Sequence, residues 1–220
     1  MNIQAIENKI KELEKIFKSR PDHYFFTEKE IHSEFYSLFQ KNVSNDIKHS
    51  LFHTEYPTPF KCSIEEKKFR IRPRKSNFKR SHIDSVVINP KFIEWISDNN
   101  EDLDYINGTP QNGLFNEYFG RIVELYGNSY HETKQSILLY AIEFKFYRHS
   151  YVGNSQPIKD ILQDLSKMES LKKFGKKFLG DEDAFVLKTK CIVILGGNVK
   201  EDLINILTKE FKGKVDFIKK

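Results

Sequence analysis

The sequence of 220 residues contains only two cysteines, Cys62 and Cys191, and neither has a partner at the spacing of a metal site. Two cysteines so far apart give no disulfide framework, so we expect a reducing compartment, the cytoplasm. Long apolar runs are also missing: the longest unbroken run, residues 137–142, is far shorter than the ~20 residues of a membrane-spanning helix. No apolar signal core follows Met1. The sequence therefore predicts a cytoplasmic protein without a membrane partner.

Phosphate-binding glycine motifs are missing as well. Gly196-Gly197 precedes a predicted helix, and backbone N–H groups at the start of a helix can hold a phosphate. The run nevertheless matches neither Gly-x-Gly-x-x-Gly nor Gly-Lys-Ser/Thr. We interpret the glycine pair as a plain turn, and a nucleotide-dependent enzyme is the weakest of the alternatives.

The composition indicates one packed domain. Hydrophobic residues make up 39% of the chain and aromatic residues 14%, which is typical of a globular protein and excludes a disordered chain. We expect a single domain over residues 1–220, with an N-terminal helix at 2–19 and an insertion at about 90–135. The helix is predicted because apolar residues recur there at intervals of three and four: Ile6, Ile10, Leu13 and Phe17.

Two apolar strands carry charge where a buried strand should have none. In residues 137–146, Glu143 and Lys145 share one face, because residues two apart in a strand point to the same side. In residues 81–88, Asp84 interrupts another apolar run. A buried carboxylate needs a cation, a hydrogen-bond network or an extra proton, so two acids with a lysine indicate a site for a divalent cation. The simpler alternative is a solvated ion pair on the sheet face with Asp84 as a strand-end cap.

Ile83-Asp84 on one strand and Glu143-Phe144-Lys145 on a later one resemble the core of the PD-(D/E)xK nuclease superfamily, which includes restriction endonucleases and archaeal Holliday-junction resolvases. Ile83 stands where the family has Pro, and the insertion separates the two acids. The resemblance implies that Asp84 and Glu143 hold Mg²⁺, with Mn²⁺ as a substitute. It also implies that Lys145 assists the attacking water on a phosphodiester. Hard oxygen ligands suit this chemistry.

The family often has a further acid on a helix before the core sheet. A second helix is predicted here by a capping box that ends at Glu30. On this helix Glu34 resembles the family's acid and is the candidate to complete the site, with Glu30 as the alternative and Glu55, on a predicted strand, as a reserve ligand. A capping role for Glu30 and a solvated Glu34 is the simpler interpretation. Asp160 and Asp164 are expected on the solvated side of a later helix.

Basic residues gather just before the strand that carries Asp84. Between Lys67 and Arg80 there are eight Lys or Arg and no acid. Basic residues that alternate along an extended segment lie on one face and suit a phosphate backbone. A solubilising hairpin is the simpler alternative. The candidate nucleic-acid-binding residues are Arg70, Arg72, Arg74, Lys75 and Arg80.

The order of the predicted elements describes an α/β domain of three layers. A central mixed sheet flanked by helices, plus the insertion, matches the restriction-endonuclease-like core. We predict a Mg²⁺-dependent endonuclease that hydrolyses DNA phosphodiester bonds in restriction, repair or defence. The alternative is a non-catalytic nucleic-acid-binding or scaffold protein with a nuclease-like fold. The formal net charge of +5 is compatible with DNA as a partner, and the first helix or the insertion is a candidate contact for a homodimer or a partner protein.

Overall fold

The computed structural model describes residues 2–21, 24–25, 27–40, 51–63, 68–70, 79–101, 115–149 and 155–220. Within these ranges the chain forms an α/β fold with one mixed, open sheet. The strands are β1 (Phe52–Ser63), β2 (Lys68–Arg70), β3 (Lys79–Ile88), β4 (Leu138–His149), β5 (Val186–Asn198) and β6 (Asp216–Lys219). The helices are α1 (Ile3–Ser19), α2 (Glu28–Gln40), α3 (Pro90–Asp98), α5 (Phe115–Thr133), α6 (Ser155–Phe174) and α7 (Glu201–Glu210), with a π-helical turn, η1 (Gly175–Leu179), after α6.

The strand order in the sheet is β2-β1-β3-β4-β5-β6. The strands from β2 to β4 pair antiparallel, whereas β4, β5 and β6 pair parallel. Parallel neighbours require a crossover connection, which α6 supplies between β4 and β5 and α7 between β5 and β6. The mixed sheet is therefore as the sequence predicts.

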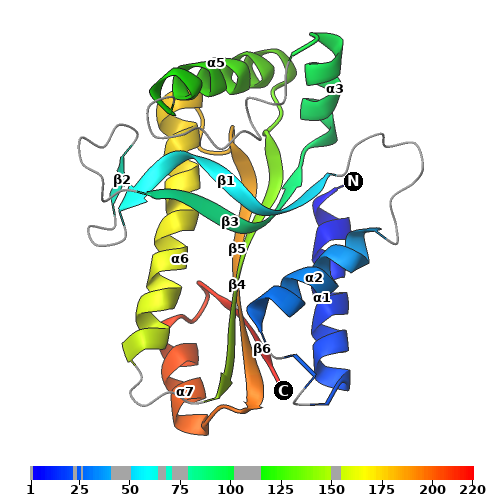
Figure 1. Cartoon of the computed structure of the whole chain (residues 1–220), viewed down its shortest axis with the longest axis vertical. Helices are drawn as coiled ribbons and strands as arrows, with labels where there is room; N and C mark the ends of the chain where they lie inside the picture. The colour runs from blue at the N-terminus through cyan, green and yellow to red at the C-terminus, as the bar shows by residue number, and fades with distance from the viewer. Residues whose placement is uncertain are drawn as a thin grey trace.

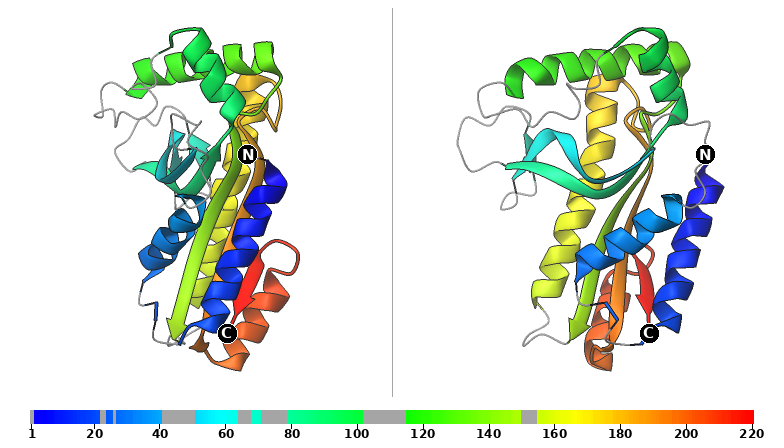
Figure 2. Two further views of the ribbon diagram at one scale, coloured as in Figure 1. Left: turned by 90° about the vertical axis from the view of Figure 1, so that its right-hand side faces the viewer. Right: turned by 45° about the vertical axis from the view of Figure 1, so that its right-hand side comes forward.

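Helices cover both faces of the sheet, as Figures 1 and 2 show. On β5, Ile192 and Ile194 pack in the same core as the apolar residues of α1 and α2. The alternate residues Val193 and Leu195 pack with α6 and α7. A strand that is buried on both faces needs a nearly continuous apolar sequence, and β4 and β5 have one. The result is a three-layer arrangement of helices, sheet and helices.

The region predicted as an insertion contributes α3 and α5, which lie at one end of the sheet (Figure 1). Their residues belong to the main core: Tyr126 of α5 packs its ring 5.7 Å from that of Phe92 in α3 and 5.4 Å from that of Phe185. The indole Nε1 of Trp95 donates a hydrogen bond of 2.7 Å to Glu132 and joins the two helices. These contacts make the two helices a cover for the end of the sheet.

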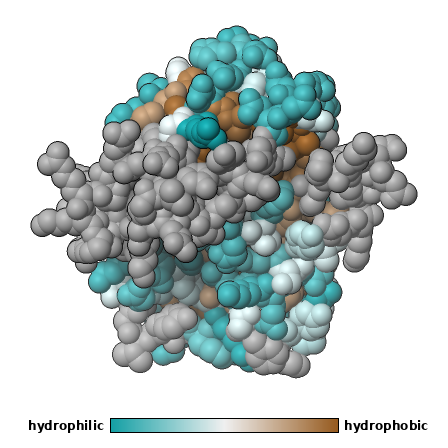
Figure 3. Space-filling view, turned by 45° about the horizontal axis from the view of Figure 1, so that its top comes forward, coloured by the Kyte–Doolittle hydropathy of each residue, from teal (hydrophilic) through white to brown (hydrophobic). Residues whose placement is uncertain are grey.

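The face that includes this end is mostly hydrophilic where Figure 3 is coloured, and hydrophobic residues show chiefly in its upper part, beside the segments drawn in grey. Hydrophilic side chains thus cover most of the coloured part of this face.

Among the described residues, no helix combines the length and the apolar character that a membrane span requires.

Strand β3 parts from β4 halfway along its length. The pairs between them run from Ile88↔Leu138 to Ser85↔Ile142, whereas β3 continues to pair with β1 as far as Lys79↔Cys62. In Figure 1 the β1 and β3 ribbons accordingly cross the direction of β4 and β5. Asp84 is the first residue of β3 beyond the last pair with β4. The strand separation therefore leaves the edge of β4 next to Asp84 without a pairing strand.

Candidate functional site

Asp84 and Glu143 meet at the point where β3 and β4 separate. The main-chain N–H of Asp84 donates a hydrogen bond of 3.3 Å to Glu143 Oε1. The main-chain N–H of Phe144 donates one of 2.8 Å to Asp84 Oδ2. Side-chain oxygens thus take over where the strand pairing ends, at Ser85↔Ile142. The structure therefore brings together the two acids singled out in the sequence.

Helix α6 adds two charged side chains, Asp164 and Lys167, which contact Lys145 and Glu143 of β4. Lys145 Nζ lies 3.1 Å from Asp164 Oδ2. Lys167 Nζ lies 2.5 Å from Glu143 Oε2 and 3.7 Å from Asp164 Oδ1. Asp164 is buried, so the expectation that it lies on the solvated side of its helix is wrong. Asp164 instead faces β4, where its carboxylate pairs with the Lys145 ammonium.

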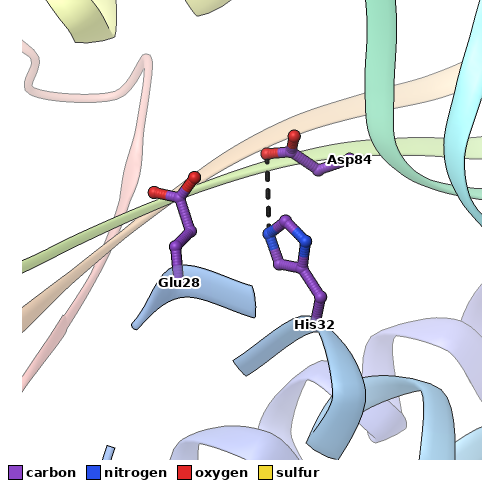
Figure 4. A group of neighbouring side chains, drawn as sticks. All are labelled: Glu28, His32 and Asp84. Carbon is purple, nitrogen blue, oxygen red and sulfur yellow. Dashed lines mark ion pairs between the residues drawn. The ribbon is translucent and has the colours of Figure 1, made fainter. Parts of the chain in front are cut away.

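Helix α2 approaches Asp84 with Glu28 and His32, as Figure 4 shows. Glu28 Oε2 accepts a hydrogen bond of 3.1 Å from the N–H of Phe146, and Glu28 Oε1 lies 3.7 Å from Lys145 Nζ. His32 Nε2 lies 3.8 Å from Asp84 Oδ2, is buried and has no hydrogen-bond partner among the described residues. The two residues are four apart and so share one side of the helix.

Glu28, His32 and Asp84 offer ligand atoms that all lie within 4.8 Å of one another. Two carboxylates and an imidazole are a common donor set for divalent metals. The buried Nε2 of His32 has no other partner in the described chain, and a metal ligand requires such an uncommitted lone pair. The residues present therefore fit a divalent cation.

We call these seven side chains, which lie within one network of contacts, the charged cluster: Glu28, His32, Asp84, Glu143, Lys145, Asp164 and Lys167. Four carboxyl groups face two ammonium groups, so with every carboxyl ionised and the imidazole neutral the charged cluster lacks two positive charges. Burying uncompensated charge is costly. One divalent cation would restore neutrality.

Burial and neighbouring charges together set the protonation of the charged cluster. It raises the pKa of Glu28, Glu143 and Asp164 above the usual carboxyl range, although the neighbouring ammonium groups act in the opposite direction. Burial lowers the pKa of His32, so the imidazole favours its neutral, metal-binding form. Burial would also lower the pKa of Lys145, but the carboxylates of Asp164, Glu28 and Asp84 outweigh it and raise that pKa. Lys145 therefore stays protonated.

The other acids proposed from the sequence have different surroundings. Glu34 is held by Arg20, whose Nη1 lies 2.9 Å from Glu34 Oε2, and it is not part of the charged cluster. Glu30 closes the predicted capping box: its Oε2 accepts 2.7 Å from the N–H of Thr27, and its own N–H donates 3.3 Å to Thr27 Oγ1. Glu55 lines a pocket beside His32. Of the acids of α2, Glu28 is thus the one that lies beside Asp84.

The basic segment proposed to bind nucleic acid is described only in part. Arg70 lies in β2 and Arg80 in β3, and only their main chain belongs to the described structure. Arg72, Arg74 and Lys75 lie outside the described residues. Their role remains the prediction made from the sequence.

Sequence reasoning missed four members of the charged cluster: Glu28, His32, Asp164 and Lys167. Glu28 and His32 are four residues apart, and Asp164 and Lys167 are three apart, so each pair has the spacing of neighbours on a helix face. That spacing is common on solvated helices and does not by itself indicate a site.

Comparison of the chain with protein-family models, with curated proteins and with solved structures found no match. We therefore take the function from the geometry of the charged cluster and from the residues that carry the sequence resemblance.

Proposed function

We propose that the protein is a divalent-cation-dependent endonuclease that hydrolyses phosphodiester bonds of DNA and has a restriction-endonuclease-like core. The observation that carries the proposal is the meeting of Asp84 and Glu143 where β3 leaves β4, with the Lys145 ammonium among the same carboxylates. The mixed sheet between two helical layers is compatible with this core.

Asp84 is the acid best placed to hold the cation. Glu143 is the second ligand implied by the sequence resemblance, and the contacts around Asp84 add Glu28 and His32. A cation bound there would stabilise negative charge on the phosphate and lower the pKa of a coordinated water. Imidazole suits Mn²⁺ better than Mg²⁺, so we expect Mn²⁺ to support activity at least as well as Mg²⁺.

Lys145 acts as a fixed positive charge in this proposal. Because the surrounding carboxylates raise its pKa, Lys145 donates hydrogen bonds and does not serve as a general base. Its side chain is 22% exposed and that of Glu28 is 33% exposed, so the charged cluster is open to solvent on this side. Lys145 can therefore contact a phosphate oxygen or orient the attacking water.

Cleavage of DNA tests the proposal. The purified chain is incubated with supercoiled plasmid and with short single-stranded, duplex and branched DNA, in Mg²⁺, Mn²⁺ or EDTA. We expect metal-dependent cutting that falls roughly 10²-fold or more in Asp84→Asn and in Lys145→Met. Cutting in EDTA, or undiminished cutting by Lys145→Met, would refute the assigned roles.

Two acids on α2 provide a matched pair for the same assay. Glu28→Gln should lower the cleavage rate about 10- to 100-fold, because Glu28 lies beside Asp84 and Lys145. Glu34→Gln should retain most of the rate, because Glu34 is committed to Arg20. Equal losses in the two variants would show that Glu28 has no special role.

A second candidate is a nucleic-acid-binding protein without catalysis. The observation that favours it is the internal ion pair of Lys167, whose ammonium already compensates Glu143 at 2.5 Å. Titration calorimetry separates the two candidates. An absence of Mn²⁺ binding, together with DNA binding that Asp84→Ala leaves unchanged, would favour the non-catalytic protein.

A further inference from the structure

A pocket of about 310 Å³ opens beside the charged cluster, between α2 and β1. Its lining residues are Lys29, His32, Ser33, Tyr36, Thr54 and Glu55. His32 belongs to both the pocket and the charged cluster, because its Nε2 lies 3.8 Å from Asp84 Oδ2. The volume is at the lower end of the range for small-molecule sites, ~300 to 1,000 Å³, and suits one planar group rather than a large ligand.

Tyr36 supplies an aromatic ring to this pocket. It is 39% exposed, and few large hydrophobic side chains of the described chain are as exposed as this. Its ring lies 5.6 Å from that of Phe52, which supports it from the sheet. A supported, exposed ring is a platform on which a nucleobase can stack.

Polar groups surround that ring. Glu55 has a φ of 51°, a left-handed conformation that is uncommon outside glycine and that is often found where a side chain is aimed for function. Glu55 and Lys29 are both exposed at the pocket. A carboxylate accepts hydrogen bonds from the amino or imino groups of a base, and an ammonium pairs with a phosphate.

We propose that this pocket binds one unstacked nucleobase of the strand whose phosphate lies at the charged cluster. Tyr36 stacks on the base, Glu55 accepts hydrogen bonds from its edge, and Lys29 pairs with an adjacent phosphate. The inference rests on the nuclease proposed above and names its substrate class: single-stranded or locally unpaired nucleic acid. A base in an intact duplex is stacked and paired, and it cannot enter such a pocket without being extruded.

The experiment uses single-stranded oligonucleotides that carry one 2-aminopurine at successive positions, because the fluorescence of this base falls when it stacks. Binding to the full chain is measured with Ca²⁺ in place of Mg²⁺, and each strand is checked for cleavage on a gel afterwards. The variants are Tyr36→Ala, Tyr36→Phe and, as a matched control, Tyr24→Ala. Tyr24 is 47% exposed and lies outside the pocket lining.

We expect the wild type, Tyr36→Phe and Tyr24→Ala to quench 2-aminopurine at one position. Tyr36→Ala should lose that quenching and bind the strand roughly 10- to 100-fold more weakly. The matched duplex should bind the wild type more weakly than the single strand does. Glu55→Gln should change which base at that position binds best. Thermal melting of each variant verifies that it is folded.

The outcomes separate this inference from the nuclease proposal. Quenching that depends on Tyr36, without any metal-dependent cutting, supports the pocket and refutes the nuclease. Metal-dependent cutting with equal strand binding by Tyr36→Ala and Tyr24→Ala refutes the pocket and leaves the nuclease standing. An absence of binding to any single strand also refutes the pocket.

Discussion

Asp84 both accepts a hydrogen bond from the main chain of β4 and donates one from its own main chain to Glu143. This exchange places two acidic side chains where the pairing of β3 with β4 stops. Lys167 supplies the nearest positive charge to Glu143, at 2.5 Å. The Lys167 ammonium therefore compensates the negative charge of Glu143, which in turn is hydrogen-bonded to Asp84.

Lys167→Met should destabilise the metal-free protein. It removes the cation from a buried carboxylate, so we expect the free energy of unfolding to fall by about 3 kcal/mol, limited by protonation of Glu143. Saturating Mn²⁺ should recover a larger share of stability in the variant than it adds to the wild type. Denaturant titration with and without Mn²⁺ measures both effects.

Lys173→Met is the control on the same helix, because Lys173 is 66% exposed and pairs only with the exposed Glu169 in the described chain. Its free energy of unfolding should change by less than about 0.5 kcal/mol. Equal losses in the two variants would contradict the account of Lys167.

The affinity for Mn²⁺ should fall as the pH is lowered. Metal and protons compete for Glu28 and Glu143, and burial raises the pKa of both above the ordinary 4.5. The midpoint of the loss should therefore lie above pH 4.5. His32 should not add a step at 6.5, because burial lowers its pKa below that value. Calorimetry over a pH series measures the midpoint, and a midpoint at or below 4.5 would be inconsistent with buried ligands.

Three residues of the charged cluster could be predicted from the sequence. Glu143, Lys145 and Asp84 stand out because each interrupts an apolar strand. Glu28 and Asp164 do not stand out, because acids are frequent on helices, and only the packing of each helix against β4 decides whether such an acid is buried. The sequence could not choose among the acids of α2 for this reason.

At the scale of elements, Glu7 connects α1 to the sheet. Glu7 of α1 accepts hydrogen bonds of 2.6 Å from the Tyr140 hydroxyl and 2.6 Å from Lys188 Nζ, and one of 3.0 Å from Lys190 Nζ. Burial would raise the pKa of Glu7, but these three donors outweigh it and lower the pKa to about 2. Glu7 thus joins the first helix to β4 and β5.

Glu7→Gln should lower the free energy of unfolding by about 1 to 2 kcal/mol at neutral pH. Because the folded pKa of about 2 lies below the ordinary 4.5, this stabilisation is present above pH 4.5 and is lost as the pH falls towards 2. The difference between variant and wild type should shrink over that interval in chemical denaturation. Glu14→Gln, which within the described residues breaks only the exposed pair with Lys18, is the control and should show little change. A difference that grows on acidification would contradict the assignment.

The helices and strands could largely be predicted from periodicity, because apolar residues recur at three and four in α1 and continuously in β4. The separation of β3 from β4 could not. Both strands continue past the point of separation, and side-chain hydrogen bonds from Asp84 and Glu143 take the place of the missing strand pairs there. A short sequence pattern does not encode that geometry.

At the scale of the whole molecule, a chain with a formal net charge of +5 holds a charged cluster in which four carboxyl groups outnumber two ammonium groups. A basic surface attracts a nucleic-acid backbone, and an acidic centre needs a cation before a phosphate can approach it. The acidic residues gather at this place because helices from both faces of the sheet reach the same part of β4. Helix α2 approaches it from one side and helix α6 from the other (Figure 2).

The central claim is that Asp84 and its neighbours bind a divalent cation. A crystal soaked in Mn²⁺ and measured for anomalous scattering tests it most directly. We predict an anomalous peak within coordination distance, ~2.0 to 2.3 Å, of the Asp84 carboxylate, with Glu143, Glu28 or His32 completing the ligands. A well-ordered crystal with no peak next to Asp84 at saturating Mn²⁺ would contradict the claim.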